Sequence, residues 1–554
     1  MSALPDRPFL TKDFSPRGGG IDFLGLRYVN LHLVGTKLIP ELNNVTRDMG
    51  TFCLGAWIPW RFAKTCEEGR KKADFTETNY REFRERIEVA ISLTMLDKST
   101  ATQQHGAVRN RVGTTQECDL PSVLSFKNAS RSKENTLYAA AIYGPALRAL
   151  ALLDRHSPKT EDGHVLNIPL ATTDADALTI LETLDRTLAK APAYRTLTTL
   201  EPKPLAWPQI DALGQAGLCP STLRSNAFKA IKPCFQRKLL PDDPASSGYA
   251  RTKTTQLLLA TLHQRPDITT DAIRNAWYTG LFDDGTKVKL PDDDLREHCA
   301  QWSFFMARQY QRYAIELFLW CFEIALSNGC RSIDGVIKYW ADRTRAAGQT
   351  LDGTFRDIME AIASNLLTGD DLKTSLKWNG TVHGAHDSME HVDSPQGDTA
   401  CLAGLRMFAG WYWRMLCREK DEAHKDIMAL GQSDRIGMAW FLEWLRTRQQ
   451  LSVPAILKDI FSDLVFSQHM RVALSRFDGH AQRLRFVLGD SGIEPTVSAK
   501  GDLGKRALPW MPDRLHTLTA LLCDIDVLEM GQDDTIHLGP RANTVKGPDS
   551  PRIK

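Results

Sequence analysis

The chain has 554 residues, of which 42% are hydrophobic and 25% charged, the composition of a globular protein with roughly three or four domains. Its net charge of +2 argues against a protein that coats nucleic acid or binds membranes through a polybasic surface. No run approaches the roughly 20 apolar residues of a membrane helix, and the first 12 residues hold no apolar signal core, so we expect a cytoplasmic protein without a membrane partner.

The first predicted domain covers residues 18–170 and follows a flexible N-terminus at residues 1–17. After a loop of three glycines, Asp22 is placed to cap a helix that ends before Pro40. Thr46 is placed to cap a second helix, whose bulky side chains recur at helical spacing and therefore share one face.

Two interpretations of this helix pair remain open. Tryptophan at helical spacing usually packs in a core, and the pair would then contain no site. Alternatively, its polar residues form a surface that binds a ligand or a partner. The residues of that surface would be Arg27, Asn43, Asn44 and Arg47.

The rest of the body is also predicted to be helical, which makes the fold mainly α and multidomain. A central domain covers residues 171–380, a polar loop 381–398, and a further helical domain 399–475. The most pronounced helix is expected from Leu295 to Ser327, where aromatic and aliphatic residues make a broad apolar face. Its length indicates a central, buried element.

The polar loop holds the densest group of potential metal ligands. Imidazole and carboxylate groups bind zinc, manganese or iron, but their spacing here matches no standard motif, and two nearby glycines favour an irregular loop. A solvated loop and a metal site both remain open. The candidate ligands are His383, His386, Asp387 and His391, with Glu390 and Asp393 nearby.

The last predicted domain, residues 476–540, differs from the helical body. Pro512-Asp513-Arg514 opens a helix with leucines on one face, and two short strands follow on either side of a turn at residues 531–534. Helix, strand, turn and strand is how a winged-helix module ends; a helix with a small hairpin is the alternative. Residues 541–554 form a polar tail that we expect to be disordered.

Basic residues flank this C-terminal module, where a winged helix would contact phosphates. They could bind double-stranded DNA or a partner, or they could form ordinary solvated surface. These residues are Arg471, Arg476, Arg483, Arg485, Lys505, Arg506 and Arg514. A further basic group comprises Arg224, Lys229, Lys232, Arg237 and Lys238.

The sequence carries no motif that fixes a reaction or a cofactor. The phosphate-binding loop Gly-x-x-x-x-Gly-Lys-Ser/Thr, the fingerprint Gly-x-Gly-x-x-Gly and the elbow Gly-x-Ser-x-Gly are missing, and we expect no cofactor. The 11 cysteines include no Cys-x-x-Cys pair, and several, such as Cys321, sit in apolar runs as reduced core residues do. A reducing cytoplasm fits this pattern.

The opening segment (residues 18–62) contains Gly18-Gly19-Gly20-Ile21-Asp22, Pro40-Glu41-Leu42-Asn43-Asn44 and Trp57-Ile58-Pro59-Trp60. Later landmarks are Tyr143-Gly144-Pro145, Arg308-Gln309-Tyr310 and Pro512-Asp513-Arg514. Through these motifs the chain resembles a loosely defined group of large, mainly helical bacterial proteins encoded in phage-defence islands. The resemblance implies a role in antiviral defence beside other defence-system proteins, and it carries over no catalytic residue.

The sequence therefore favours a non-enzymatic helical subunit of a bacterial anti-phage defence system. Such a subunit would bind DNA or a partner protein through its C-terminal module and basic faces. Two alternatives remain open. One is a divergent metal-dependent nuclease centred on residues 383–393, and the other is a sensor of a phage protein whose tryptophan-rich helices form a partner groove.

Overall fold

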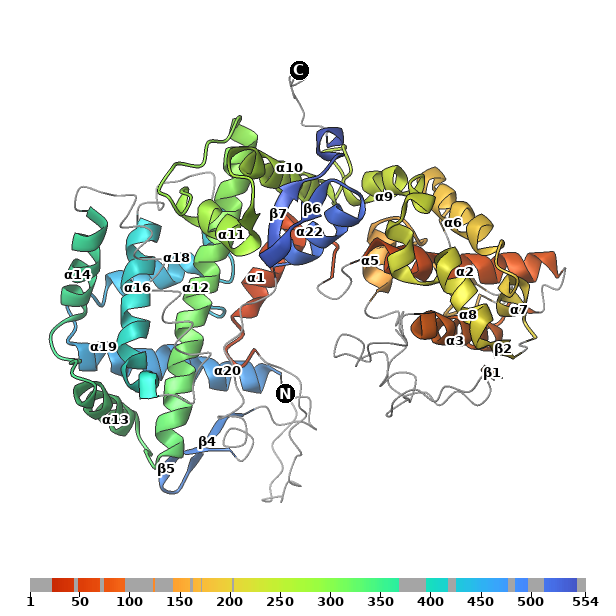
Figure 1. Cartoon of the computed structure of the whole chain (residues 1–554). Coiled ribbons are helices and arrows are strands. Elements are labelled where there is room, and N and C mark those ends of the chain that lie inside the picture. The colour runs from red at the N-terminus through yellow and green to blue at the C-terminus, as the bar shows by residue number, and fades with distance from the viewer. Residues whose placement is uncertain are drawn as a thin grey trace. The chain divides into compact units, whose positions relative to one another are not determined.

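The chain folds into two compact units, each described here by itself (Figure 1). The first unit takes its residues from 1–33, 271–289 and 296–511, and the second from 34–270, 290–295 and 512–554. The structure is a computed structural model. It describes residues 22–43, 48–69, 74–94, 123–124, 143–159, 163–170, 172–201, 204–367, 395–416, 425–476, 484–496 and 513–545. Helices make up most of the described chain, so the predicted mainly α fold is confirmed.

The first unit is a helical body with one small hairpin. Its elements are α1 (Arg27–Leu33), α11 (Thr270–Thr279), α12 (Asp293–Ser327), α13 (Ile333–Ala346), α14 (Phe355–Leu367), η7 (Pro395–Thr399), α16 (Ala400–Leu416), α17 (Lys425–Ala429), α18 (Met438–Arg446), α19 (Val453–Asp459), η9 (Ile460–Ser467), α20 (Gln468–Ser475), β4 (Phe486–Gly489) and β5 (Gly492–Pro495).

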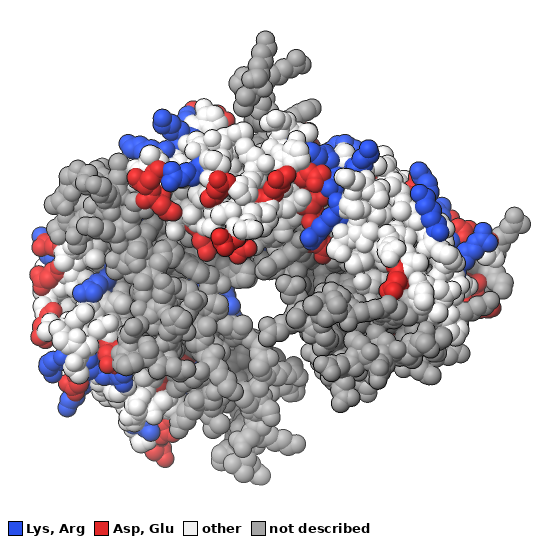
Figure 2. All heavy atoms as spheres, in the orientation of Figure 1, with Lys and Arg blue, Asp and Glu red and all other residues white. Residues whose placement is uncertain are grey.

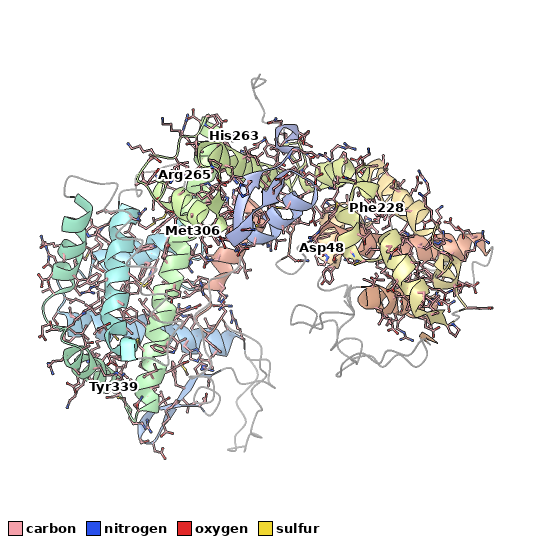
Figure 3. The ribbon with its side chains drawn as sticks, viewed as in Figure 1. Asp48, Phe228, His263, Arg265, Met306 and Tyr339 are labelled. Carbon is pink, nitrogen blue, oxygen red and sulfur yellow. The ribbon has the colours of Figure 1, made fainter. Side chains whose placement is uncertain are left out.

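Helix α12 is the central element of the first unit, as its predicted length suggests, and α16 lies along it (Figure 1). The indole Nε1 of Trp411 donates to the carbonyl oxygen of Ala307 at 2.9 Å. The rings of Phe318 and Phe408 pack with their centroids 5.2 Å apart. Met306 of α12 is also buried (Figure 3). Each buried aromatic side chain contributes about 1.5–3 kcal/mol through removal of apolar surface from water.

The second unit combines helices with a three-stranded sheet. Its elements are η1 (Val34–Leu38), α2 (Met49–Glu68), α3 (Glu77–Thr94), β1 (Val123–Leu124), α5 (Gly144–Ala149), α6 (Ala175–Leu188), α7 (Tyr194–Thr198), β2 (Leu205–Ala206), α8 (Trp207–Leu213), η4 (Gly214–Leu218), η5 (Pro220–Arg224), η6 (Asn226–Phe228), α9 (Ile231–Leu239), α10 (Tyr249–Gln264), β3 (Ile268–Thr269), α22 (Leu515–Asp524), β6 (Leu528–Met530), η10 (Gln532–Asp534), β7 (Thr535–Leu538) and η11 (Ala542–Thr544).

Helix α2 is the core helix of the second unit, and its N-terminal cap lies two residues after the predicted one. Asp48 caps it: the carboxylate accepts a hydrogen bond from the N–H of Thr51 at 2.7 Å (Figure 3). Thr46, the expected cap, lies outside the described residues. Gly50 lets the first turn approach η5, because a Cβ atom there would lie 2.2 Å from the carbonyl oxygen of Pro220.

The sheet of the second unit joins segments that are far apart in the sequence. Strand β7 lies in the middle, antiparallel to β6 and to β3, with Ile536 opposite Ile268. The predicted order of helix, strand, turn and strand is present in α22, β6 and β7. The first strand starts at Leu528 and not at Ile525, because the N–H of Val527 still bonds the carbonyl of Leu522 in the last turn of α22.

The residues predicted as one C-terminal module, 476–540, are divided between the units. Residues up to 511 belong to the first unit, where β4 and β5 form a hairpin, and the later ones belong to the second. Gly492 closes the β4–β5 turn with φ at +116°, a value that favours glycine. The beginning of the predicted tail is anchored, because Arg541 donates to Oε1 of Gln236 at 2.7 Å.

One helix of the first unit was missed in the sequence, and the expectation of no membrane helix can be compared with the described helices. Helix α13 was not predicted, because Gly335 and its many polar residues hide the short apolar stripe of Val336 and Trp340. Within the described ranges, no helix combines the length and the apolar character needed to cross a membrane.

Candidate functional site

Residues 22–41, which we call the leading stretch, include Arg27 and accept hydrogen bonds from two other predicted binding residues, Arg476 and Arg514. In the first unit, Oδ1 of Asp22 accepts from the N–H of Leu26 at 2.8 Å and so caps the start of α1. The guanidinium of Arg476 donates to the carbonyl oxygen of Asp22 at 2.6 Å and to its carboxylate at 3.2 Å. Gln468 donates to the carbonyl of Leu24 at 2.8 Å. The leading stretch is therefore fixed by side chains of α20 and the residue after it.

Arg308 of α12 makes the most buried of these contacts. Its side chain is fully buried, and it donates to the carbonyl oxygens of Leu26 (3.1 Å) and Arg435 (2.8 Å) and also to that of Ile436. Burial, helped by the charge of Arg312, lowers the pKa of Arg308 to about 9. A buried charge held mainly by carbonyl dipoles is costly, so this arginine is a fixed structural element.

The leading stretch is held in the same way in the second unit. The hydroxyl of Thr254 donates to the carbonyl of Leu38 at 2.8 Å, and Arg514 donates to the carbonyl of Ile39 at 2.8 Å. Arg251, which is 1% exposed, donates to the carbonyl of Pro40 at 2.9 Å and pairs with Glu41 at 2.7 Å. Buried main-chain carbonyls outside regular helix need such partners, and arginine with five donors supplies several at once.

Arg485, a predicted surface residue, is instead buried at 2% exposure. Its Nε lies 2.8 Å from Oε1 of Glu323, which is fully buried on α12. Its main-chain N–H donates to Nε2 of His469 at 2.9 Å, so the neutral ring carries its hydrogen on Nδ1, which lies 3.0 Å from the carbonyl of Phe23. The side chain of Arg485 therefore has no free surface to offer a phosphate.

The other predicted binding residues do not form one surface. Nε of Arg27 lies 3.9 Å from Oε1 of Glu316, and Asn43 is half-buried at the end of its segment. Arg471 is exposed on α20, and its side chain makes no ion pair or hydrogen bond with any described residue. The predicted residues outside the described chain are Asn44, Arg47, Arg483, Lys505 and Arg506.

The basic group around α9 is largely neutralised by acidic partners. Ion pairs join Arg224 to Asp524 at 2.7 Å, Lys232 to Asp526 at 2.7 Å and Arg237 to Asp176 at 2.5 Å, and Lys238 pairs with Asp174. The fifth residue of this group, Lys229, has no ion pair among the described residues. Paired cations attract phosphates less, so this group presents little net positive charge.

Among the described aspartates and glutamates, Asp524 has a pKa that is clearly raised. Its carboxylate accepts from the N–H of Met49 at 2.7 Å and is 4% exposed. Burial raises the pKa of Asp524 to about 6, although Arg224 and the N–H of Met49 act in the opposite direction. The carboxyl thus takes up a proton in a mildly acidic range, where an ordinary aspartate stays ionised.

The candidate metal ligands His383, His386, Asp387 and His391 lie outside the described residues, as do Glu390 and Asp393. Elsewhere, the described ranges contain no group of three or more histidine, cysteine, aspartate or glutamate side chains placed to hold a metal ion. The metal site therefore stays a prediction.

Sequence reasoning missed the polar side of α12. It assigned this helix a broad apolar face, but Arg308, Arg312, Glu316 and Glu323 are buried too. The signal was present: aromatic residues on all sides of residues 302–322 indicate a helix buried all round, and polar residues on such a helix must also be inside.

Comparisons with known proteins assign no family. No family model matches the chain, and neither a curated protein nor a solved structure is similar enough to count as a match.

Two of the predicted binding arginines form a matched pair for mutation. We expect Arg485→Ala to lower the free energy of unfolding of the first unit by about 3–5 kcal/mol, because it leaves Glu323 buried without its partner. Arg471→Ala, on an exposed helix face, should change it by less than about 0.5 kcal/mol. Urea unfolding followed by circular dichroism measures both. Equal stability of the two variants would contradict the structural role of Arg485.

A second prediction concerns pH. The folded Asp524 binds its proton more tightly than the unfolded chain, so the native state gains stability relative to Asp524→Asn as pH falls from about 6 to about 4. We expect the difference in unfolding free energy between the two proteins to shift by roughly 2–3 kcal/mol in favour of wild type across this window. Denaturant titrations at about five pH values test it. If the difference in unfolding free energy between the two proteins does not change with pH, the pKa of Asp524 is not raised by folding and the prediction is wrong.

Proposed function

We propose that this chain is a non-enzymatic helical subunit of a bacterial antiviral (anti-phage) defence system, and that it binds a partner protein of that system. The protein would act in the cytoplasm, because its scattered cysteines fit a reducing compartment. The link to defence comes from the opening segment and the later landmarks that resemble proteins of phage-defence islands.

The observation that carries the proposal is a pair of hydrogen bonds between those landmarks. Arg308 donates to the carbonyl of Leu26, and Arg514 donates to the carbonyl of Ile39. Each bond joins a later landmark to the opening segment. The residues behind the resemblance thus hold the chain together, and what the group would share is an architecture. A shared architecture without shared catalytic residues suits a subunit that supports or recognises other proteins.

Two observations favour a protein partner over DNA. A recognition helix must present one face to the major groove, but α22 is buried along most of its length, and His516 is the one exposed residue of this helix. The hairpin that follows is acidic, with Glu529, Asp533 and Asp534 exposed. Figure 2 shows acidic side chains gathered on this part of the surface. Such charges repel phosphates.

Co-purification tests the proposal directly. We expect the protein, purified from cells that carry its native operon after nuclease treatment and at moderate salt, to retain other defence-system proteins such as a helicase, methylase or nuclease subunit in stoichiometric amounts. Nuclease treatment removes associations that depend on DNA. The same tag on an unrelated cytoplasmic protein is the control.

A lone protein that retains metal or cleaves DNA would favour the enzyme instead. Complex formation only in extract of infected cells would favour a phage sensor.

The nuclease alternative has its own test. If residues 383–393 hold a catalytic metal, His386→Ala should abolish defence while the protein stays folded, because removal of one ligand opens the coordination sphere. We expect the variant to protect cells against phage as well as wild type does. Plaque counts with matched protein levels measure this. Loss of protection by a folded His386→Ala protein would contradict the non-enzymatic assignment.

A further inference from the structure

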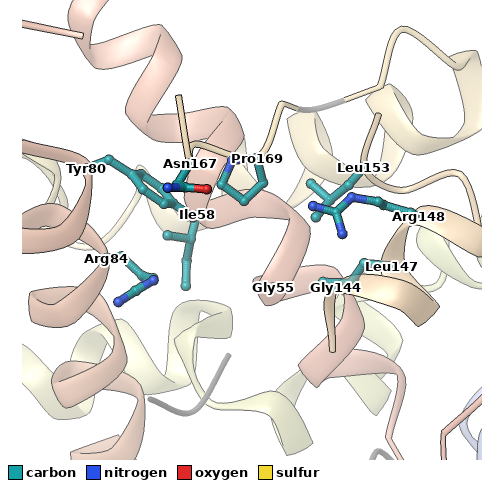
Figure 4. A pocket seen from close by; sticks show the side chains of 10 residues that line it. All are labelled: Gly55, Ile58, Tyr80, Arg84, Gly144, Leu147, Arg148, Leu153, Asn167 and Pro169. Carbon is teal, nitrogen blue, oxygen red and sulfur yellow. The ribbon is translucent and has the colours of Figure 1, made fainter. Parts of the chain in front are cut away.

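The second unit contains a small hollow between α2, α3 and α5 (Figure 4). Its volume is about 50 Å³, which holds roughly three to five groups the size of a water molecule. Ligand pockets for whole small molecules are usually about 300–1,000 Å³. The hollow therefore has room for the end group of a larger molecule. Its apolar wall consists of Ile58, Leu147, Leu153 and Pro169, together with Gly55 and Gly144.

Three hydrogen-bond donors on this wall have no acceptor among the described residues. Nε of Arg84 is buried and donates no hydrogen bond. Arg148, half-buried, forms no ion pair or hydrogen bond with the described chain, and Figure 4 shows its guanidinium directed into the hollow. The hydroxyl of Tyr80 likewise bonds to no described residue, and burial raises the pKa of Tyr80, so it remains a phenol that can donate.

The described residues that line the hollow include two cations, Arg84 and Arg148, and no carboxylate. Arg84 has a partial partner, since its Nε lies 3.5 Å from Oε1 of Glu88. Arg148 adds a second positive charge, and it forms no ion pair with a carboxylate of the described residues. Donors that lack an acceptor and a surplus cation are the features of an oxyanion site. The aliphatic wall beside them suits an oxyanion that is carried on an apolar group.

We propose that this hollow binds the C-terminal carboxylate of a partner polypeptide whose last side chain is aliphatic. Capture of a terminal carboxylate is a recurring mode of peptide recognition. The carboxylate would accept from Arg148, Arg84 and Tyr80, and the last side chain would lie against Ile58 and Leu147. The inference rests on the proposed function in one respect, namely that the partner is a protein.

The charge of the ligand distinguishes a carboxylate from a phosphate. A carboxylate carries one negative charge, which matches the surplus of one cation left after Glu88 is counted against Arg84. A phosphate would bring close to two charges. A nucleotide base would also need a larger apolar pocket than the hollow provides.

Saturation-transfer NMR with the full-length protein tests the proposal. The probes are N-acetyl-leucine as its carboxylate, N-acetyl-leucinamide and inorganic phosphate. We expect N-acetyl-leucine to bind and the amide to bind at least about tenfold more weakly, because the amide lacks the charge that the arginines recognise. Equal binding of acid and amide, stronger competition by phosphate, or no binding of N-acetyl-leucine would each overturn the proposal.

Matched variants place the binding in the hollow. Arg148→Gln should weaken N-acetyl-leucine about tenfold, and Tyr80→Phe should weaken it less, since only a hydroxyl is removed. Arg155→Gln is the control, because Arg155 is exposed and does not line the hollow. Circular dichroism confirms that each variant is folded. If Arg155→Gln weakens binding as much as Arg148→Gln, the site lies elsewhere.

The two proposals can fail independently. If N-acetyl-leucine binds in the hollow but the protein co-purifies with no partner, the carboxylate site stands and the proposed defence complex does not. If a complex forms and Arg148→Gln leaves both it and the N-acetyl-leucine signal unchanged, the complex stands and the carboxylate site is wrong.

Discussion

Hydrogen bonds from side chains to the main-chain carbonyls of the leading stretch are the interaction on which both units depend. In the first unit the donors come from Gln468, Arg476 and Arg308, and in the second from Thr254, Arg251 and Arg514. A buried carbonyl that loses its partner carries a penalty of about 1–3 kcal/mol; the carbonyls of Asp22 and Pro40 also accept from the N–H groups of Gly25 and Leu42. The stretch belongs to the first unit up to Leu33 and to the second from Val34, so neither unit is complete without it.

This way of building a core places acidic side chains inside the protein together with the arginines. A buried arginine is tolerated when its N–H groups have hydrogen-bond acceptors. The N–H groups that do not bond to a main-chain carbonyl need a carboxylate. Glu316 and Glu323 serve Arg312 and Arg485 in this way, and Glu41 serves Arg251. Several charged side chains that the sequence suggests as part of a binding surface therefore form ion pairs in the interior. Exposed residues without partners, such as Arg471, are the places left for recognition.

The sequence predicts many of the helices and hairpins, but it does not predict which distant residues contact one another. Periodicity placed α12 to within two residues, since 295–327 was expected and 293–327 is observed, and turn residues located the β6–β7 hairpin. Both signals are local. The pairing of β3 with β7 depends on two residues far away in the chain, and a two-residue strand has no periodicity to read. The burial of Arg485 was likewise hidden, because its partners Glu323 and His469 are not its neighbours in sequence.

The C-terminal residues complete the second unit after a long excursion of the chain. The second unit is left at Thr270, apart from residues 290–295, and is resumed at Pro512. Closing such a long loop costs little more than closing a short one, about 0.6 kcal/mol per doubling of length. The bond from Met49 to Asp524, the pair of Lys232 with Asp526 and the β3–β7 ladder offset this cost. A helix and hairpin so occupied serve to close their own unit, and this favours the hollow and the exposed faces over α22 as places where the proposed partner would bind.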